Sequence, residues 1–280
     1  MKQNQILVKT TYDSVIVSKF LKSKRLKFIF TLFAVLFLSI STTQAVIKVV
    51  PFTTPGATTW TCPAGVTSIT VECWGGGGAG GGAKYTGTSK NAYGGGGSGG
   101  GYAKKVISVS PGTKYKLFVG NGGIGTIPTA DNEVASAGTA SFFIDNSTIN
   151  ANGGVGGNGS INSGSTDVTG TGGVFNIKGQ VGSKLFNGGN GGTAIDCSGS
   201  GGGSGGIYRN GNNGSSSLSI TVAVAAGGPG GEGVNVVKVN NAGGVPGGGG
   251  GGSKANSNGT EQQGGDGGAG QITITYVITE

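Results

Sequence analysis

The stretch WTCPAGVTSITVECWGGGGAGGG (residues 60–82) decides the fold, because two β-like segments run directly into almost unbroken glycine. Apolar and polar residues alternate along the second segment, so Ile69, Val71 and Cys73 would share one face. Strict alternation of this kind is typical of an antiparallel strand with one buried face. A second glycine block, residues 94–101, leads into another alternating segment. The stretch therefore predicts strands that continue into glycine-rich segments.

Alternating segments recur along the chain, and each predicts a strand. The clearest are 102–109 and 114–119, which we expect to form a hairpin across Ser110-Pro111-Gly112, a turn sequence with proline before glycine. The other expected strands are 46–52, 140–144, 149–151, 217–224 and 271–278. Because glycine and β-branched residues both disfavour helix, we predict an all-β fold.

The apolar faces of these strands define the predicted core. We expect one sandwich in which the first and last strands meet, with the glycine-rich segments inserted between them. The predicted core residues are Trp60, Ile69, Val71, Tyr115, Leu117, Ile272, Ile274 and Tyr276.

Residues 1–45 are predicted to be an export signal. Basic residues at 22–27 precede an apolar run at 28–40, and small residues follow it. We expect cleavage between Ala45 and Val46, because this run is shorter than the ~20 residues that span a bilayer. The alternative is a short membrane anchor. The prediction is a secreted, extracellular or cell-surface protein with a single domain over 46–280 and no stable membrane span after cleavage.

The net charge belongs mostly to the leader. The whole chain has a net charge of +8, but residues 1–45 hold seven of the 19 Lys and Arg and one of the 11 acids. What remains has a net charge of about +2, which gives no basis for nucleic-acid binding.

Glycine is concentrated after residue 45, where all 65 glycines lie. They make up about 28% of that part, against ~7% in average proteins. The blocks NGGVGGNG (152–159) and NGGNGG (187–192) repeat every three residues, which is the period of the polyproline-II helix. Two glycines in three predict two packed edges and one outward side chain, with lateral hydrogen bonds between backbones. The inserts at about 75–101, 152–206 and 225–270 are thus expected to form bundled polyglycine or polyproline-II helices; flexible loops are the alternative.

The run Trp-Thr-x-Pro-x-Gly-Val-Thr-Ser-Ile-Thr-Val-Glu-x-Trp before the first glycine block resembles the secreted glycine-rich domains of bacterial surface proteins. These look related to the polyglycine-helix adhesins of phage tail-fibre tips and to the glycine-rich ectodomain of anaplastic-lymphoma-type receptor kinases. The match continues through 110–112 and 119–123 to 270–276. The resemblance implies an all-β, antiparallel β-sandwich of the jelly-roll, tumour-necrosis-factor-like type with inserted polyglycine helices.

Three cysteines are present, and two alternatives stay open for the first pair. A tight hairpin across 63–65 would leave Cys73 about seven residues from Cys62 along the strand, too far to bridge. A Cys62–Cys73 disulfide therefore requires the two segments to lie in facing sheets; otherwise both are buried thiols. Cys197, in a polar stretch, is expected to be unpaired.

The residues argue against catalysis. The chain has no histidine, the commonest general base. The match of GNGGIG (120–125) to a dinucleotide fingerprint is rejected, because no helix follows it. We expect no enzyme activity, cofactor or metal.

The aromatic and basic side chains of the inserts are candidates for ligand recognition. The alternative is that they are ordinary solvent-exposed loop residues without a ligand. The candidate ligand contacts are Lys84, Tyr85, Lys90, Tyr93, Tyr208 and Arg209, which turns would present together at one end of a bundle.

The expected function is that of an exported, non-enzymatic cell-surface or extracellular protein in adhesion or structure. The alternative is an adhesin module that binds a surface glycan or a protein receptor. Ice binding is a third reading, but it needs a regular Thr or Ala face, and the spacers here are mixed. The sequence does not indicate an oligomeric state.

Overall fold

The computed structural model describes residues 44–87, 90–216, 221, 224, 226–234 and 241–279. All regular secondary structure within these residues is β-strand, and none of it is helix. The predicted export signal up to residue 43, and the expected strand 217–224 apart from Thr221 and Val224, lie outside these residues. Residues 46–278 form one unit, and only this unit is considered below. Within the described part, no helix is long and apolar enough to cross a membrane.

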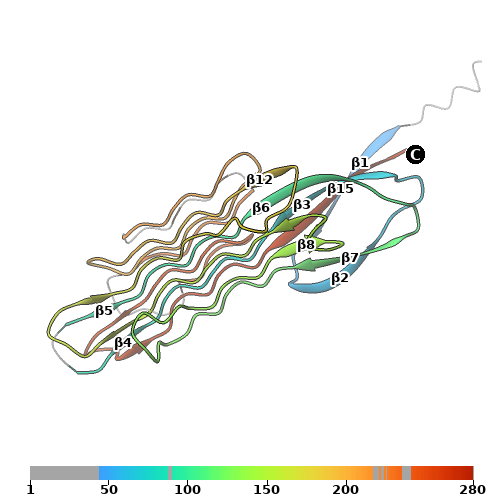
Figure 1. The fold of residues 1–280 in the computed structure, drawn as a ribbon. Helices are drawn as coiled ribbons and strands as arrows, with labels where there is room; N and C mark the ends of the chain where they lie inside the picture. The colour runs from blue at the N-terminus through green and yellow to red at the C-terminus, as the bar shows by residue number, and fades with distance from the viewer. Residues whose placement is uncertain are drawn as a thin grey trace, which may run out of the picture. The chain divides into compact units, whose positions relative to one another are not determined.

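Two sheets form a sandwich at one end of this unit (Figure 1). The five-stranded sheet has the order β1-β15-β3-β6-β12, and the four-stranded sheet has the order β2-β7-β8-β9. From β15 to β12 in the first sheet, and throughout the second, neighbouring strands are antiparallel. The bounds are β1 Ala45–Phe52, β2 Gly56–Thr61, β3 Ser68–Trp74, β6 Tyr102–Ser108, β7 Lys114–Val119, β8 Ser141–Phe143, β9 Asn150–Ala151, β12 Lys184–Phe186 and β15 Gln271–Thr279. The all-β, sandwich-like prediction is confirmed.

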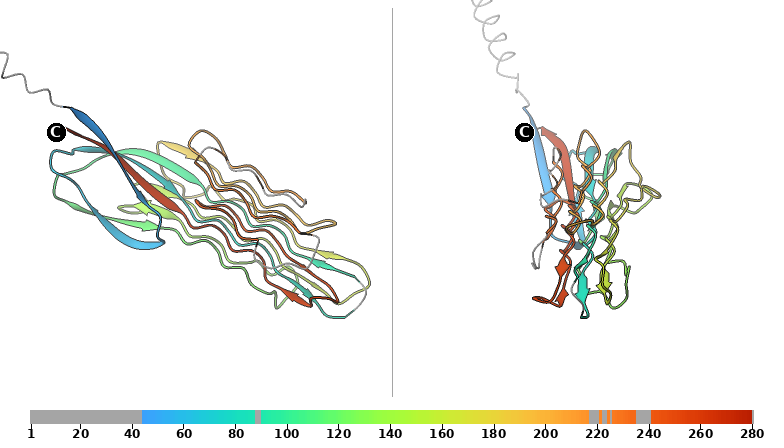
Figure 2. Two further views of the ribbon diagram at one scale, coloured as in Figure 1. Left: turned by 180° about the vertical axis from the view of Figure 1, so that it is seen from behind. Right: turned by 90° about the vertical axis from the view of Figure 1, so that its left-hand side faces the viewer.

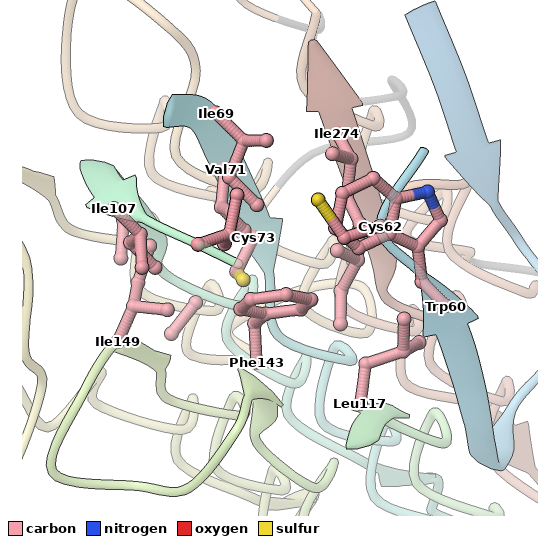
Figure 3. Packing of buried hydrophobic residues seen from close by; sticks show 14 of the residues in the cluster. Trp60, Cys62, Ile69, Val71, Cys73, Ile107, Leu117, Phe143, Ile149 and Ile274 are labelled. Carbon is pink, nitrogen blue, oxygen red and sulfur yellow. The ribbon is translucent and has the colours of Figure 1, made fainter. Parts of the chain in front are cut away.

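The predicted core is confirmed for six of its eight residues, which are buried in one apolar cluster between the sheets (Figure 3). The other two, Tyr115 and Tyr276, are only partly buried and pack against this cluster. Ile274 of β15 lies beside Val71 of β3, so the last strand closes the core as expected. The Trp60 ring lies 6.1 Å from Tyr115 and 5.8 Å from Tyr276, measured between ring centroids. Tilted aromatic contacts of this length add to the free energy of burial.

The predicted hairpin between 102–109 and 114–119 is wrong, although its turn is present. Gly112 has a φ of +77°, as the proline–glycine turn requires. However, β6 pairs with β3, and β7 pairs with β2, so the turn crosses from one sheet to the other. Alternation determines which face of a strand is buried, and it leaves the choice of partner open.

Six further strands form two small sheets at the opposite end of the glycine-rich segments (Figures 1 and 2). We call these strands and their loops the tip. One sheet has the order β10-β4-β14 and the other β11-β5-β13. The bounds are β4 Ala83–Tyr85, β5 Ala92–Tyr93, β10 Ser160–Asn162, β11 Val168–Thr169, β13 Lys254–Ala255 and β14 Glu261–Gln262.

Between the sandwich and the tip, the glycine-rich segments pack side by side in an array (Figure 2). Backbone N–H groups of segment 94–101 donate in rotation to three neighbours, so every third residue faces the same one. Gly94, Gly97 and Gly100, for example, donate to carbonyls of segment 247–253 over 2.8, 2.8 and 2.7 Å. The six neighbours bonded to this segment are 75–82, 152–159, 170–175, 187–193, 198–206 and 247–253. The array thus satisfies its backbone polar groups between segments, as helices and sheets do by their own ladders.

Packing, and not backbone conformation, explains most of the glycines. Among the described glycines, φ is positive only at Gly56, Gly65, Gly87, Gly112, Gly179 and Gly247. At Gly97, by contrast, an added Cβ would collide with the carbonyl oxygens of Gly78 and Ala79. The array therefore excludes side chains wherever two backbones meet.

Spacer residues follow the predicted rule. In segment 187–192, the glycines on both sides of Asn190 abut neighbouring backbones, while Asn190 is half-buried at the edge. Interior segments have only small residues in place of spacers, such as the fully buried Ser98. Its hydroxyl oxygen accepts the Val155 N–H at 2.7 Å, so it replaces a backbone carbonyl as the lateral acceptor. Composition along a segment thus reports how many of its edges are covered.

Candidate functional site

Two small sheets at the tip hold three loops, 86–91, 163–167 and 256–260. Ala83, Ala92 and Ala255 are fully buried between the sheets, and Tyr85 packs against them. Methyl-sized side chains let strands of two or three residues approach closely enough to exclude water. The tip therefore has a small core of its own beneath its loops.

Asn162 anchors two of these loops. Its side chain is fully buried, and Nδ2 donates to the carbonyl oxygens of Asn91 and Thr166, each at 2.8 Å. Its Oδ1 accepts the Gly164 N–H at 2.8 Å, so both ends of the amide are bonded. A buried amide without partners would be costly, and this network ties Asn91, at the end of loop 86–91, to loop 163–167. Sequence analysis missed Asn162, because an asparagine before Ser-Gly has the pattern of an ordinary turn.

Charged side chains surround the loops in mixed sign. Lys84 Nζ lies 2.7 Å from a Glu261 carboxylate oxygen, and the ammonium group of Lys254 lies over the Tyr93 ring, 5.3 Å from its centroid. The Asp167 carboxylate accepts the Asn91 N–H at 2.7 Å. Surface ion pairs such as Lys84–Glu261 contribute little to stability. The bond between Asp167 and Asn91 connects two of the loops.

The four candidate contact residues at the tip differ in how far they are exposed to solvent. Lys90 is exposed, Lys84 and Tyr85 are half-buried, and Tyr93 is only 4% exposed. Burial, together with the negative charges of Asp167 and Asp196, raises the pKa of the Tyr93 hydroxyl. Tyr93 is thus a neutral, supporting residue beneath the loops.

Tyr208 and Arg209 lie at the other end of the array, which corrects the expectation that one end presents all six candidates. Segment 198–206 runs alongside segment 94–101 and ends beside Gly100, where Gly205 donates to the Gly100 carbonyl at 2.9 Å. The turn that follows therefore lies next to the sandwich, with Tyr208 75% exposed. The end of the array at which a turn lies depends on the direction in which the preceding segment runs. The amino-acid composition does not indicate that direction.

Similarity to a known protein family extends over most of the chain. A model described as a glycine-rich domain matches residues 53–277, which covers the sandwich, the array and the tip. The chain belongs to this glycine-rich domain family. A comparison with curated proteins found no match. The family therefore includes the whole architecture and not the glycine blocks alone.

Cysteines in this glycine-rich domain are free thiols, so the disulfide left open by the sequence is not formed. Their segments do lie in different sheets, as the bond requires. However, Cys62 is at the turn end, where Sγ contacts the Val66 carbonyl at 3.2 Å, and Cys73 is near the array end of β3. The strand from Ser68 to Cys73 alone spans ~16 Å, far beyond bridging distance. Burial raises the pKa of both thiols, and the Glu72 carboxylate adds to the effect at Cys73.

Where the sandwich meets the array, the glycine-rich domain buries an aromatic cluster. Tyr102 packs between Trp74 and Phe186, with ring centroids 5.0 and 6.0 Å away. Its hydroxyl donates to Glu72 Oε1 at 2.6 Å, and Lys104 Nζ lies 3.4 Å from the same oxygen. Burial and the bond to Glu72 raise the pKa of the Tyr102 hydroxyl. The cluster fixes the junction, and Tyr102 and Lys104 both contact Oε1 of Glu72.

Within the described residues, no group of three or more His, Cys, Asp or Glu is placed to hold a metal ion. Two shallow surface hollows lie on the sandwich, one lined by 51–58 and the other by Thr58, Phe118, Phe142 and their neighbours. The tip loops are therefore the most organised candidate surface for recognition.

Proposed function

We propose that this glycine-rich domain is an exported, non-enzymatic protein of the cell surface or extracellular space, with a role in adhesion or structure. The observation that carries the proposal is the array itself, in which hydrogen bonds tie segments far apart in sequence into one body. Glycine loses more conformational freedom on folding than any other residue, so such an array forms only with many lateral bonds together. The lack of histidine supports a role without acid–base catalysis.

The array segments are, in this proposal, polyglycine helices of the polyproline-II type. Three observations support the assignment: the three-residue rotation of donors, bonds that run between segments, and φ values that are not positive at the interior glycines. A rod of this kind resists bending, because each segment is bonded on several sides.

A specific adhesin is the second candidate function, by likeness to the phage tail-fibre adhesins and the receptor-kinase ectodomain. The anchoring of two tip loops by Asn162 favours it, because loops held on a rigid support bind with little loss of entropy. The ligand class would be a surface glycan or a protein receptor.

Binding through the tip is tested by removing its exposed side chains. Lys90→Ala combined with Asn258→Ala should reduce binding to glycan arrays or target cells at least about tenfold, since each lost polar contact is worth ~1 kcal/mol. Tyr208→Ala with Arg209→Ala is the matched control at the other end of the array, and it should bind as the unchanged protein does. Equal losses in both double variants would refute recognition at the tip. No specific binding by the unchanged protein would leave the structural role.

Export is tested by the N-terminus of the secreted protein. Mass spectrometry should find Val46 as the first residue, because small residues precede the bond. A product that keeps residues 28–40 and stays in the membrane would contradict the prediction.

A further inference from the structure

Charge in this domain is divided between its two ends, although the sequence after residue 45 is almost neutral. The described residues of the sandwich, with the turn 207–209 beside it, include eight Lys and Arg and two acids, Glu72 and Asp145. The described residues of the array and tip carry three Lys and seven Asp and Glu. The sandwich is therefore strongly basic, and the rest of the described domain is acidic.

The basic side chains are available to a partner. Lys114, Lys116, Lys178 and Lys184 are exposed, and none has a carboxylate partner in the described part of the chain. The acid nearest to them on the five-stranded sheet, Glu72, is already bonded to Tyr102 and Lys104. On the four-stranded sheet, Asp145 follows Ile144, whose N–H donates to the Lys116 carbonyl at 2.8 Å, so one carboxylate lies near that lysine. The described part of the sandwich still has a large excess of positive charge.

These lysines occupy opposite outer faces of the sandwich. Lys114 and Lys116 alternate with the inward-facing Tyr115 and Leu117 of β7, so they point outward from the four-stranded sheet. Lys184 lies beside Lys104 across β12 and β6, on the outer face of the five-stranded sheet. A flat anionic surface could contact only one of these faces, whereas a flexible chain can reach both.

We infer that the sandwich is a binding surface for a flexible polyanion, a chain polymer that bears phosphate groups. Several lysines acting together bind such a chain by releasing its condensed counterions, which makes affinity strongly salt-dependent. The acidic array and tip are repelled by the same polymer, so the domain would be held by its sandwich with its tip directed away. This attachment does not depend on what the tip binds.

The test uses the secreted protein and long-chain inorganic polyphosphate, with dissociation constants measured over a range of NaCl concentrations. The variant Lys114→Gln, Lys116→Gln, Lys184→Gln should bind at least about tenfold more weakly. Its slope of log affinity against log salt should be smaller by about 2, given ~0.7 for each lost contact to a single-stranded polyanion. Thermal unfolding verifies that the variant is folded.

Lys84→Gln with Lys90→Gln is the control at the tip, and it should leave polyphosphate binding unchanged. No binding by the unchanged protein at low salt, or an equal loss in both variants, would overturn the inference. Vesicles of phosphatidylcholine and phosphatidylglycerol form a second arm. Tighter binding to these vesicles than to polyphosphate would overturn the polymer in favour of a membrane surface.

Discussion

Gly97→Ala is expected to destabilise the folded domain by about 3 kcal/mol, because the new methyl group would separate backbones and break lateral hydrogen bonds at ~0.5–1.5 kcal/mol each. The site lies in segment 94–101, the interior segment with six bonded neighbours. An added Cβ there meets the backbone of Gly78 and Ala79, which has no room to move. Chemical denaturation of the purified protein measures the change.

Ile124→Ala is the control, because Ile124 is a spacer in the array and 64% of its side chain is exposed. We expect a change of less than about 0.5 kcal/mol. Asn190 is a weaker control than its place as a spacer indicates, since its Oδ1 accepts the Phe175 N–H at 3.0 Å. Flexible loops would reverse the sign at Gly97, because alanine there would reduce the entropy of the unfolded chain.

Ile274→Ala should cost about 2–5 kcal/mol of unfolding free energy, the usual range for a large cavity in a packed core. The Ile274 side chain is fully buried, and its strand β15, the last one in the described residues, pairs with β3. Without its contacts, the sandwich loses the strand that closes it after the last glycine-rich segment.

Val277→Ala on the same strand is the matched control, with its side chain 51% exposed. It should change stability by less than about 0.5 kcal/mol. A similarly small loss for Ile274→Ala would show that β15 does not belong to the core.

Alternation predicted the sandwich well, because half-buried strands impose a period of two on apolar residues. The core-facing residues predicted for β3, β7 and β15 do lie in or against the core, among them Ile272, Ile274 and Tyr276. Thr273, on the other face of β15, is also buried, which alternation does not predict. Which strands pair with each other was harder to predict, as the incorrect hairpin at Gly112 shows. Two strands with the same buried face can pair with each other or lie in facing sheets, and the pattern is identical in both cases.

Glycine blocks revealed their period and not their neighbours. A segment of repeating glycine can shift by three residues and present the same backbone, so the sequence alone does not assign its register. Buried hydroxyls remove this ambiguity locally: Ser98 accepts the Val155 N–H and Ser204 the Gly228 N–H, at 2.7 and 2.8 Å. The tip was missed because strands of two or three residues are too short to show alternation.

Hydrogen exchange of the array amides tests the central claim most directly. Amides of segments 75–82 and 94–101 should exchange about as slowly as those of β3 and β6, because each of the bonds described above must open first. The exposed loop residues Gly87 and Lys90 lie between these segments in sequence, and their amides serve as the internal standard for fast exchange. Exchange of both glycine segments at the rate of that loop would contradict the account, and would reduce the domain to a β-sandwich with unstructured inserts.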